Sequence, residues 1–459
     1  MVKLKVKTYI NNTFPYFAFL RYCLGKKRNM SRVIAGMDWQ MLYSFASKQA
    51  LLGLCFDGIE KLGKENPEEL RRNPIGRELL MTWMGKAQQI RRQNRKVNTV
   101  AGKLFSMLRE DGLRCCILKG QGNALMYPNP YSRTPGDIDV WIDASRERIM
   151  EYAQKKFELE DDIRLQHLET SLDGVPVELH FFPCSMNNPI YHARLQKWFR
   201  RNADLQCSHI VGLPDGAGDI AIPTTAFNVI YQLTHLYHHF FDEGIGMRQI
   251  IDYFLVVNDF SKNVFLNNDL SNPSVSLSKG SSTSHPSPLS SEERDVTALR
   301  CSEPLRSKDG GASKPSPGCA GWDRLAIEGD NSAGSTTVVT SSASTALDVV
   351  QKELKHLGLW KFAGAVMYVL HEALGLPEEK MIAPMDEKRG KLLLAEILNG
   401  GNFGRHFTKY GHFTQQGMAK KYFLKIWRNM HFVRFFPAEA LSEPIFRTWH
   451  FFWRLKHRR

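Results

Sequence analysis

The sequence predicts an α+β protein in which a small mixed β-sheet core is embedded in a mainly helical shell. Residues 113–215 alternate short apolar, strand-like runs with helical segments, which is typical of a layered core. On either side, residues 37–112 and 216–260 repeat apolar side chains at the helical spacing, and this pattern resumes over residues 347–459. With 459 residues, of which 43% are hydrophobic and 11% aromatic, the chain can form a substantial core and two or three domains.

Residues 1–36 are expected to be a basic, poorly ordered N-terminal leader. Lysines precede a short apolar stretch, but Pro15 and Arg21 interrupt it and no small-residue cleavage site follows. A signal peptide is therefore not expected. Met30 and Met37 are alternative translation starts, because the helical pattern begins only at residue 38.

The N-terminal helical region ends in a long pattern over residues 77–110, with Gly112 as its stop signal. The middle of this pattern, residues 88–96, is basic and polar. We expect a solvated helix face there, and contact with an acceptor nucleic acid is the alternative.

The predicted core consists of short elements. In order, they are a strand at 114–118, a helix near 122–127, a strand that contains Asp137 and Asp139, a helix over 144–157, and strands at 163–170 and 175–181. Asp173-Gly174 lies between the last two strands and is a hairpin signal, so these strands should pair with each other.

Asp137 and Asp139 stand at alternate positions of the second strand, just after a Gly-rich turn. Because side chains alternate along a strand, both carboxylates should project from one face while Ile138 and Val140 enter the core. Two carboxylates this close repel each other unless a cation lies between them. Mg²⁺ is the simplest candidate, because it takes oxygen ligands and keeps positions open for substrate phosphates. The pair therefore indicates metal-assisted phosphoryl or nucleotidyl transfer.

A third carboxylate, Glu178, lies on the last predicted strand, where it shares a face with His180. If the hairpin pairs beside the aspartate strand, Glu178 joins Asp137 and Asp139 in one acidic cluster.

The order of these motifs resembles the nucleotidyltransferase superfamily of the polymerase-beta type. More closely, it resembles a bacterial family of uncharacterised nucleotidyltransferases. The motifs are Leu118-Lys119-Gly120, then Arg133 followed by Gly136-Asp137-Ile138-Asp139, then Val177-Glu178-Leu179-His180. The resemblance implies a nucleotidyltransferase-type sheet that moves a nucleoside monophosphate from a nucleoside triphosphate, such as ATP, to a hydroxyl acceptor. The acceptor would be a small molecule, a protein or RNA, and the cofactor Mg²⁺ or Mn²⁺.

The resemblance also implies roles for individual residues. Asp137, Asp139 and Glu178 would be catalytic and would hold the metal ions, with Glu178 binding the second ion or accepting the proton of the attacking hydroxyl. Glycines at the turn would let the backbone approach the phosphates. The candidate substrate- and phosphate-binding residues are Lys119, Gly120, Gln121, Gly122, Arg133 and His180.

The phosphate-binding turn departs from the superfamily pattern. The usual turn is Gly-Ser, whereas this chain has Gly120-Gln121, so the serine hydroxyl is missing. Lys119 or Arg133 can supply positive charge instead. The departure supports an alternative function: a catalytically inactive binding module of the same fold that holds a nucleotide, nucleic-acid or protein partner.

The helical region after the core contains His235, His238 and His239. Two of these are four residues apart, as in zinc sites, but the glutamate of a His-Glu-x-x-His motif is absent. We therefore expect packed or solvent-facing histidines, with a metal role as the alternative. In the resembled family this helix and the next one cover the catalytic domain, which makes His235 or Asp252 a candidate nucleotide contact.

Residues 261–346 are dominated by serine, threonine, glycine and proline and show no hydrophobic period. Such a composition buries too little apolar surface to offset the entropy lost on ordering. We expect a disordered insertion.

Residues 420–459 are rich in tryptophan, phenylalanine, arginine and lysine. We expect this tail to pack its aromatic face on the protein, and weak contact with an anionic membrane surface is the alternative. The net charge of +14 favours anionic partners. No apolar run reaches the length of a membrane span, and the eight cysteines lack Cys-x-x-Cys spacing, which predicts a cytoplasmic protein without disulfides.

Overall fold

The computed structural model describes residues 15–26, 29–159, 164–271, 342–406 and 418–457. Backbone contacts divide the chain into two units, and the larger one comprises residues 1–269 and 341–459. The fold and the site described below belong to that unit. Most of the predicted insertion at residues 261–346 lies outside the described residues, although helices continue through residue 271 and resume at residue 342.

The N-terminal region is helical. Residues 15–23 form a helix. The helices that follow are α2 (Ser31–Ala35), α3 (Trp39–Lys48), α4 (Leu52–Glu65), α5 (Pro67–Arg72) and α6 (Arg77–Glu110). Phe17, Phe19 and Leu20 are buried in the main hydrophobic core. The described part of the expected leader is therefore a packed helix and not a poorly ordered segment. Its apolar stretch is one face of a packed helix.

Helix α6 has the bounds that the sequence predicts and supports one side of the sheet. Its basic middle is mostly exposed, as expected for a solvated face, although Arg91 pairs with Asp57 and Glu60, both at 2.5 Å. At Gly102 the backbone carbonyl of Ala217 lies so close that a Cβ atom would clash with it. The glycine therefore allows a loop to pack directly on the helix.

The sheet has four strands in the order β1-β2-β4-β3. The strands are β1 (Cys115–Leu118), β2 (Ile138–Ile142), β3 (His167–Leu172) and β4 (Val175–His180). β1 is antiparallel to β2, β2 is parallel to β4, and β3 is antiparallel to β4, so the sheet is mixed. Asp173 and Gly174 both have positive φ, at 50° and 69°, and close a two-residue hairpin turn. The predicted α+β class and the hairpin are confirmed.

The two faces of the sheet have different chemistry. One face is apolar: Val140 of β2 and Leu179 of β4 pack with Leu104 of α6 and with Ile149 of α8 (Arg146–Lys156) in a second hydrophobic core. The opposite face carries polar side chains next to Trp141, which joins the main core. This polar face lies towards α9 (Pro189–Ser208) and α10 (Thr225–Asp242). Between β1 and β2 lie the short helix α7 (Gly120–Ala124) and the turn η1 (Pro130–Ser132).

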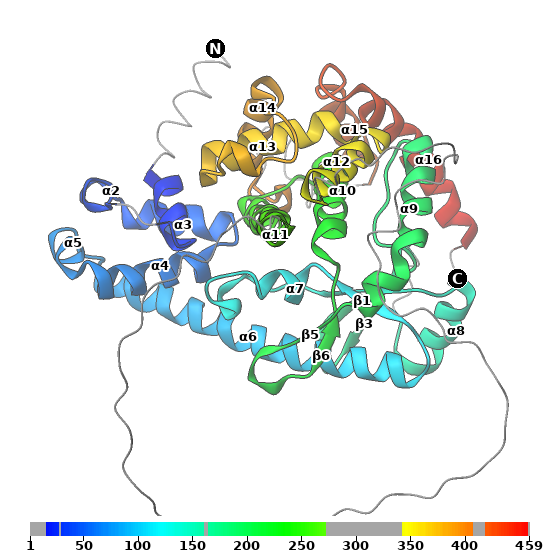
Figure 1. Ribbon diagram of the computed structural model, residues 1–459, viewed down its shortest axis with the longest axis horizontal. Helices are drawn as coiled ribbons and strands as arrows, with labels where there is room; N and C mark the ends of the chain where they lie inside the picture. The colour runs from blue at the N-terminus through cyan, green and yellow to red at the C-terminus, as the bar shows by residue number, and fades with distance from the viewer. Residues whose placement is uncertain (1–14, 27–28, 160–163, 272–341, 407–417, 458–459) are drawn as a thin grey trace, which may run out of the picture. The chain divides into compact units, whose positions relative to one another are not determined.

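Further elements complete the shell. A small hairpin, β5 (Ile210–Gly212) and β6 (Asp219–Ala221), with the turn η2 (Pro214–Gly216), precedes α10. The C-terminal elements are α11 (Met247–Ser271), α12 (Ser342–His356), α13 (Trp360–Leu374), η3 (Glu378–Lys380), α14 (Glu387–Gly400), η4 (Asn402–Gly404), α15 (Met418–Met430) and α16 (Pro437–His457). In Figure 1, α6 lies on the side of the sheet away from α13 and α14.

The aromatic tail packs on the protein through one face. Phe432 and Phe436 contact Phe240 of α10, at ring-centroid distances of 4.6 and 5.9 Å. The backbone N–H of Asn187 donates to the buried Glu439 carboxylate of α16 at 2.6 Å. None of the described helices combines the length and the apolar character needed to cross a bilayer.

Candidate active site

The three predicted carboxylates converge at the polar face of the sheet. Asp139 of β2 lies opposite Glu178 of the parallel strand β4 in the pairing register. Asp137 stands one residue before β2 and is exposed, whereas Asp139 is buried. The charges of Asp139 and Glu178 both act on Asp137. The acidic cluster expected from the strand period is therefore present.

Asp139 is neutralised by two neighbours, whereas Asp137 is not. The Asp139 carboxylate lies 3.0 Å from Lys119 Nζ and 3.1 Å from His180 Nε2. Burial opposes ionisation, but these two groups outweigh it and hold the pKa of Asp139 well below its usual value. The negative charge of Asp139, with burial second, raises the pKa of Asp137 to about 6. Within the described parts of the chain, no basic group lies within 4.0 Å of Asp137.

Lys119 is held firmly at the end of β1. Its backbone has φ 50° and ψ −132°, a conformation that non-glycine residues rarely adopt. The ammonium donates to His235 Nε2 at 2.6 Å as well as contacting Asp139. Burial and the Lys119 charge keep the pKa of His235 well below its usual value, so the imidazole is neutral and accepts this bond. Lys119 thus neutralises a carboxylate before any ligand arrives.

The predicted glycine turn contributes one residue to the site. Gly120 lines the pocket between the sheet and the helices. Gln121 is buried and donates to Asn98 of α6, so its side chain points to the scaffold. A Cβ atom on Gly122 would lie 3.0 Å from the Ile222 side chain, which shows that this glycine serves close packing.

Arg133 is part of a buried ion pair. Its Nε and one terminal nitrogen donate to the two carboxylate oxygens of Asp252 at 2.9 and 2.8 Å, and the Tyr127 hydroxyl donates to Asp252 at 2.7 Å. Although burial alone would lower the pKa of Arg133, the Asp252 charge raises it. The guanidinium lines the pocket, but the two nitrogens that could bind a phosphate in a bidentate way already bind Asp252.

Arg248 and Gln249, on the first turn of α11, offer unused donors to the pocket. Both are 8% exposed. One terminal nitrogen of Arg248 donates to the Thr134 carbonyl at 3.0 Å, whereas Nε has no partner among the described residues. The Gln249 carbonyl accepts from the Gly246 backbone at 3.0 Å, which leaves its amide nitrogen without a described partner. Burial and the Arg133 charge lower the pKa of Arg248.

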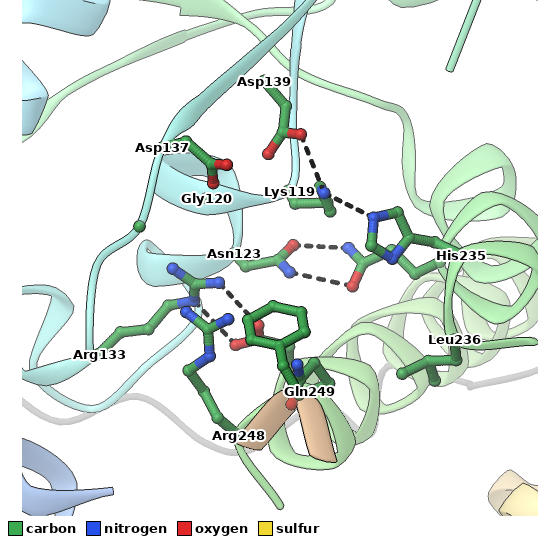
Figure 2. Close-up of a pocket in the computed structure, with 14 residues that line it drawn as sticks. Lys119, Gly120, Asn123, Arg133, Asp137, Asp139, His235, Leu236, Arg248 and Gln249 are labelled. Atoms are coloured by element: carbon green, nitrogen blue, oxygen red, sulfur yellow. Dashed lines mark hydrogen bonds and ion pairs between the residues drawn. The ribbon is translucent and has the colours of Figure 1, made fainter. Parts of the chain in front are cut away.

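These groups line a pocket with about 530 Å³ of space, part of which is open to solvent. Figure 2 shows Asp137 and Asp139 on one side and Arg248 and Gln249 on the other. The Arg248 guanidinium lies 5.5 Å from the ring centroid of Phe403, another lining residue. An exposed carboxylate therefore faces a wall of N–H donors, an arrangement that suits a cation bound together with an acceptor-rich anion.

The metal role that is the alternative for the histidine helix has no matching ligand group among the described residues. His235 contacts Lys119 and lies 3.3 Å from His239, and the group with metal-binding geometry in the described chain is His167, Glu178 and His180 instead. His235 and Asp252 do line the pocket, whereas His180 contacts the carboxylates from the side.

A family model described as an uncharacterised nucleotidyltransferase matches residues 35–271. The chain belongs to this family. The match includes all three carboxylates and also Arg248, but it ends before Phe403. No curated protein and no solved structure matches the chain.

Sequence reasoning assigned no role to Arg248, Gln249, Phe403 or His167. A signal existed for two of them. Arg248 begins the predicted helix that contains Asp252, and His167 stands two residues before Glu169, on the predicted hairpin. Phe403 gives no local signal, because its place in the pocket depends on contacts between distant segments.

Proposed function

We propose that this protein is a Mg²⁺-dependent nucleotidyltransferase that moves a nucleoside monophosphate from a nucleoside triphosphate to a hydroxyl acceptor. The observation that carries the proposal is the position of Asp137 beside the paired Asp139 and Glu178, across one pocket from Arg248. The wider polymerase-beta-type superfamily, a bacterial source and a cytoplasmic location stay predictions.

The chemistry of the carboxylates fits a hard divalent cation. Asp137 is exposed, and repulsion by the Asp139 charge raises its pKa. A cation shared by the two carboxylates would relieve this repulsion. Although burial alone would raise it, the pKa of Glu178 is lowered, first through its hydrogen bond with His180, so this carboxylate is ionised at neutral pH. Asp137, Asp139 and Glu178 would therefore hold Mg²⁺ or Mn²⁺. Bound there, the ion would supply charge neutralisation for the phosphates.

The other side chains divide the remaining work. Arg248 and Gln249 would bind phosphate oxygens with the donors that the fold leaves unused, in place of the missing serine after Gly120. Lys119 orients Asp139 through their ion pair. Arg133 supports the pocket through Asp252 and is not proposed as a phosphate ligand. Binding to Arg248 would hold the triphosphate so that the α-phosphate lies near the carboxylates.

Calorimetric titration of each nucleoside triphosphate, with Mg²⁺ and with a chelator, tests this function. The wild type should bind at least one of the nucleoside triphosphates, and should bind it more tightly with Mg²⁺ than with the chelator. The variant Asp137→Asn/Asp139→Asn should lose this metal dependence, although its remaining cations can still attract the nucleotide. Glu110→Ala, an exposed carboxylate at the end of α6, is the matched control. Arg248→Ala should weaken nucleotide binding roughly 10- to 100-fold, as expected for hydrogen bonds to a charged group.

The second candidate is a catalytically inactive module that keeps the fold and holds a nucleotide, nucleic-acid or protein partner. The Gly120-Gln121 turn favours it, because Gln121 is bound to Asn98 rather than facing the pocket. The same titration separates the two. Nucleotide binding without metal dependence in folded wild type would favour this module, and absence of any nucleotide binding would exclude the transferase.

A further inference from the structure

We propose that His167, Glu178 and His180 form a second metal site, which takes a borderline divalent transition-metal ion such as Zn²⁺ or Co²⁺. The site shares Glu178 with the proposed Mg²⁺ site but differs from it in chemistry. Imidazole nitrogen favours transition metals, whereas Mg²⁺ favours oxygen. The proposal does not require nucleotidyl transfer, since the three ligands are defined by the sheet alone.

Strand pairing places the three ligands. His167 of β3 lies opposite His180 of β4 in the antiparallel register. Glu178 stands two residues before His180, and therefore on the same face of the same strand. All three side chains come from regular strands rather than loops, so their spacing follows from the backbone.

The spacing matches that of ligands around one ion. Glu178 Oε2 lies 3.0 Å from His180 Nε2 and 3.5 Å from His167 Nδ1. Metal–nitrogen and metal–oxygen bonds of about 2.1 Å place neighbouring tetrahedral ligands roughly 3.4 Å apart. One ligand atom from each residue falls within 4.8 Å of the others. Asp139 lies outside this group, although its carboxylate is 3.1 Å from His180 Nε2.

His167 is a buried residue whose nearest polar neighbours are carboxylates of the same sheet. It is 9% exposed, yet neither ring nitrogen makes a hydrogen bond there. The nearest carboxylate oxygens are those of Glu178 at 3.5 Å and Glu169 at 3.6 Å. Buried polar groups normally have at least one partner, and an unpartnered one costs about 1–3 kcal/mol. A metal ion between His167, Glu178 and His180 would provide that partner.

Gln166 lies against the other ring nitrogen of His180, so a substitution at position 166 should change the affinity of the site for metal. His180 Nδ1 lies 3.3 Å from the Gln166 amide nitrogen, which also donates to the Pro183 carbonyl at 3.1 Å. An ion on Nε2 leaves the ring proton on Nδ1, so the Gln166 amide must turn to present its oxygen. A carboxylate at position 166 would accept the hydrogen bond from His180 Nδ1–H directly, and this would make His180 a stronger metal ligand.

An ion at this site would compete for Glu178. Because Glu178 then coordinates the transition metal, it is no longer available to the ion held by Asp137 and Asp139. The expected consequence is that Zn²⁺ weakens Mg²⁺-dependent nucleotide binding, whereas binding of Zn²⁺ itself needs no nucleotide.

Titration of the full chain with Co²⁺ in excess Mg²⁺, followed by visible absorption and equilibrium dialysis, tests the site. The wild type should bind one Co²⁺ and show ligand-field bands. His167→Gln should weaken binding at least tenfold, and Gln166→Glu should tighten it about tenfold. Glu110→Ala and His235→Gln should leave Co²⁺ binding unchanged, since neither residue belongs to the site.

Two results would overturn the proposal. One is folded wild-type protein that binds no stoichiometric Co²⁺. The other is loss of binding in His235→Gln with retention in His167→Gln, which would move the ion to the histidine helix. Because these readouts involve no nucleotide, failure here leaves the nucleotidyltransferase proposal intact, and failure of nucleotide binding leaves this site intact.

Discussion

Replacing Asp252 by asparagine is expected to destabilise the protein strongly, because Asp252 is the counter-ion of Arg133. The ion pair is bidentate, and the two side chains are only 6% and 5% exposed. Removing one partner of a buried pair costs about 3–5 kcal/mol, since the remaining charge has no compensation. The asparagine keeps the size of the side chain and can still accept the hydrogen bond of Tyr127, so the change tests the charge.

Urea denaturation followed by circular dichroism measures the effect. The midpoint should fall with an unchanged slope. The double variant Arg133→Met/Asp252→Leu, which removes both charges and keeps apolar volume, should lose less stability than Asp252→Asn alone. Inorganic phosphate should also stabilise Asp252→Asn more than the wild type, because the released Arg133 guanidinium lines the pocket and can bind the anion.

A loss of less than about 1 kcal/mol in Asp252→Asn would refute this reasoning, since an isolated buried charge costs more than that. A second contradictory result is a double variant that keeps full stability but loses nucleotide binding as completely as Arg248→Ala. Arg133 would then be the phosphate ligand that the sequence suggested.

Two further predictions concern α16. Burial raises the pKa of Glu439 to about 7, although the hydrogen bonds from Asn187 and Asn188 act in the opposite direction. Between pH 4.5, its ordinary pKa, and pH 7, Glu439 therefore holds its proton in the folded state and loses it in the unfolded state. Stability should therefore fall by roughly 3 kcal/mol as pH rises from about 4.5 to 7, and Glu439→Gln should flatten this dependence in denaturation curves measured across that range. The outer face of α16 exposes Ile445 and Trp449, by 72% and 50%, in a tail rich in basic residues, so the protein should float with vesicles that contain anionic lipid. Ile445→Ser/Trp449→Ser should reduce flotation about tenfold, while Met81→Ser, on α6 and 57% exposed, should not; equal flotation of both variants would exclude this contact.

The acidic cluster could be predicted from the sequence because each step is local. Side-chain alternation places Asp137, one residue before β2, on the same face as Asp139, and the two-residue turn at Asp173 fixes the hairpin that contains Glu178. The local signals do not determine how β2 pairs with the hairpin. Parallel pairing of β2 with β4 is the simplest way to bring the carboxylates together, and the sheet has that pairing.

The residues proposed to bind phosphate could not be predicted in the same way. Arg133 and Lys119 have the right charge, but their distant partners Asp252 and His235 decide whether that charge is available. Availability depends on tertiary contacts, which no local period encodes. Arg248 shows the converse, since it becomes a candidate only because the fold buries it without an ion pair within 4.0 Å among the described residues.

The N-terminal stretch illustrates a different limit. A short apolar run after several lysines has the composition of a start region, and only its packing shows that Phe17, Phe19 and Leu20 belong to the core. The helix is too short for its own periodicity to be decisive.

The position of Phe403 has a consequence for how the protein is made. The residues of the pocket that lie in the family match are all synthesised by residue 271, yet Phe403 emerges much later. At about 5–20 residues per second, a ribosome needs on the order of ten seconds to reach it. During that interval the nascent chain carries its carboxylates and arginines without the aromatic wall beside Arg248. Nucleotide capture should therefore begin only after most of the chain has left the ribosome, and a protein shortened at residue 271 would keep the charged residues without a complete pocket.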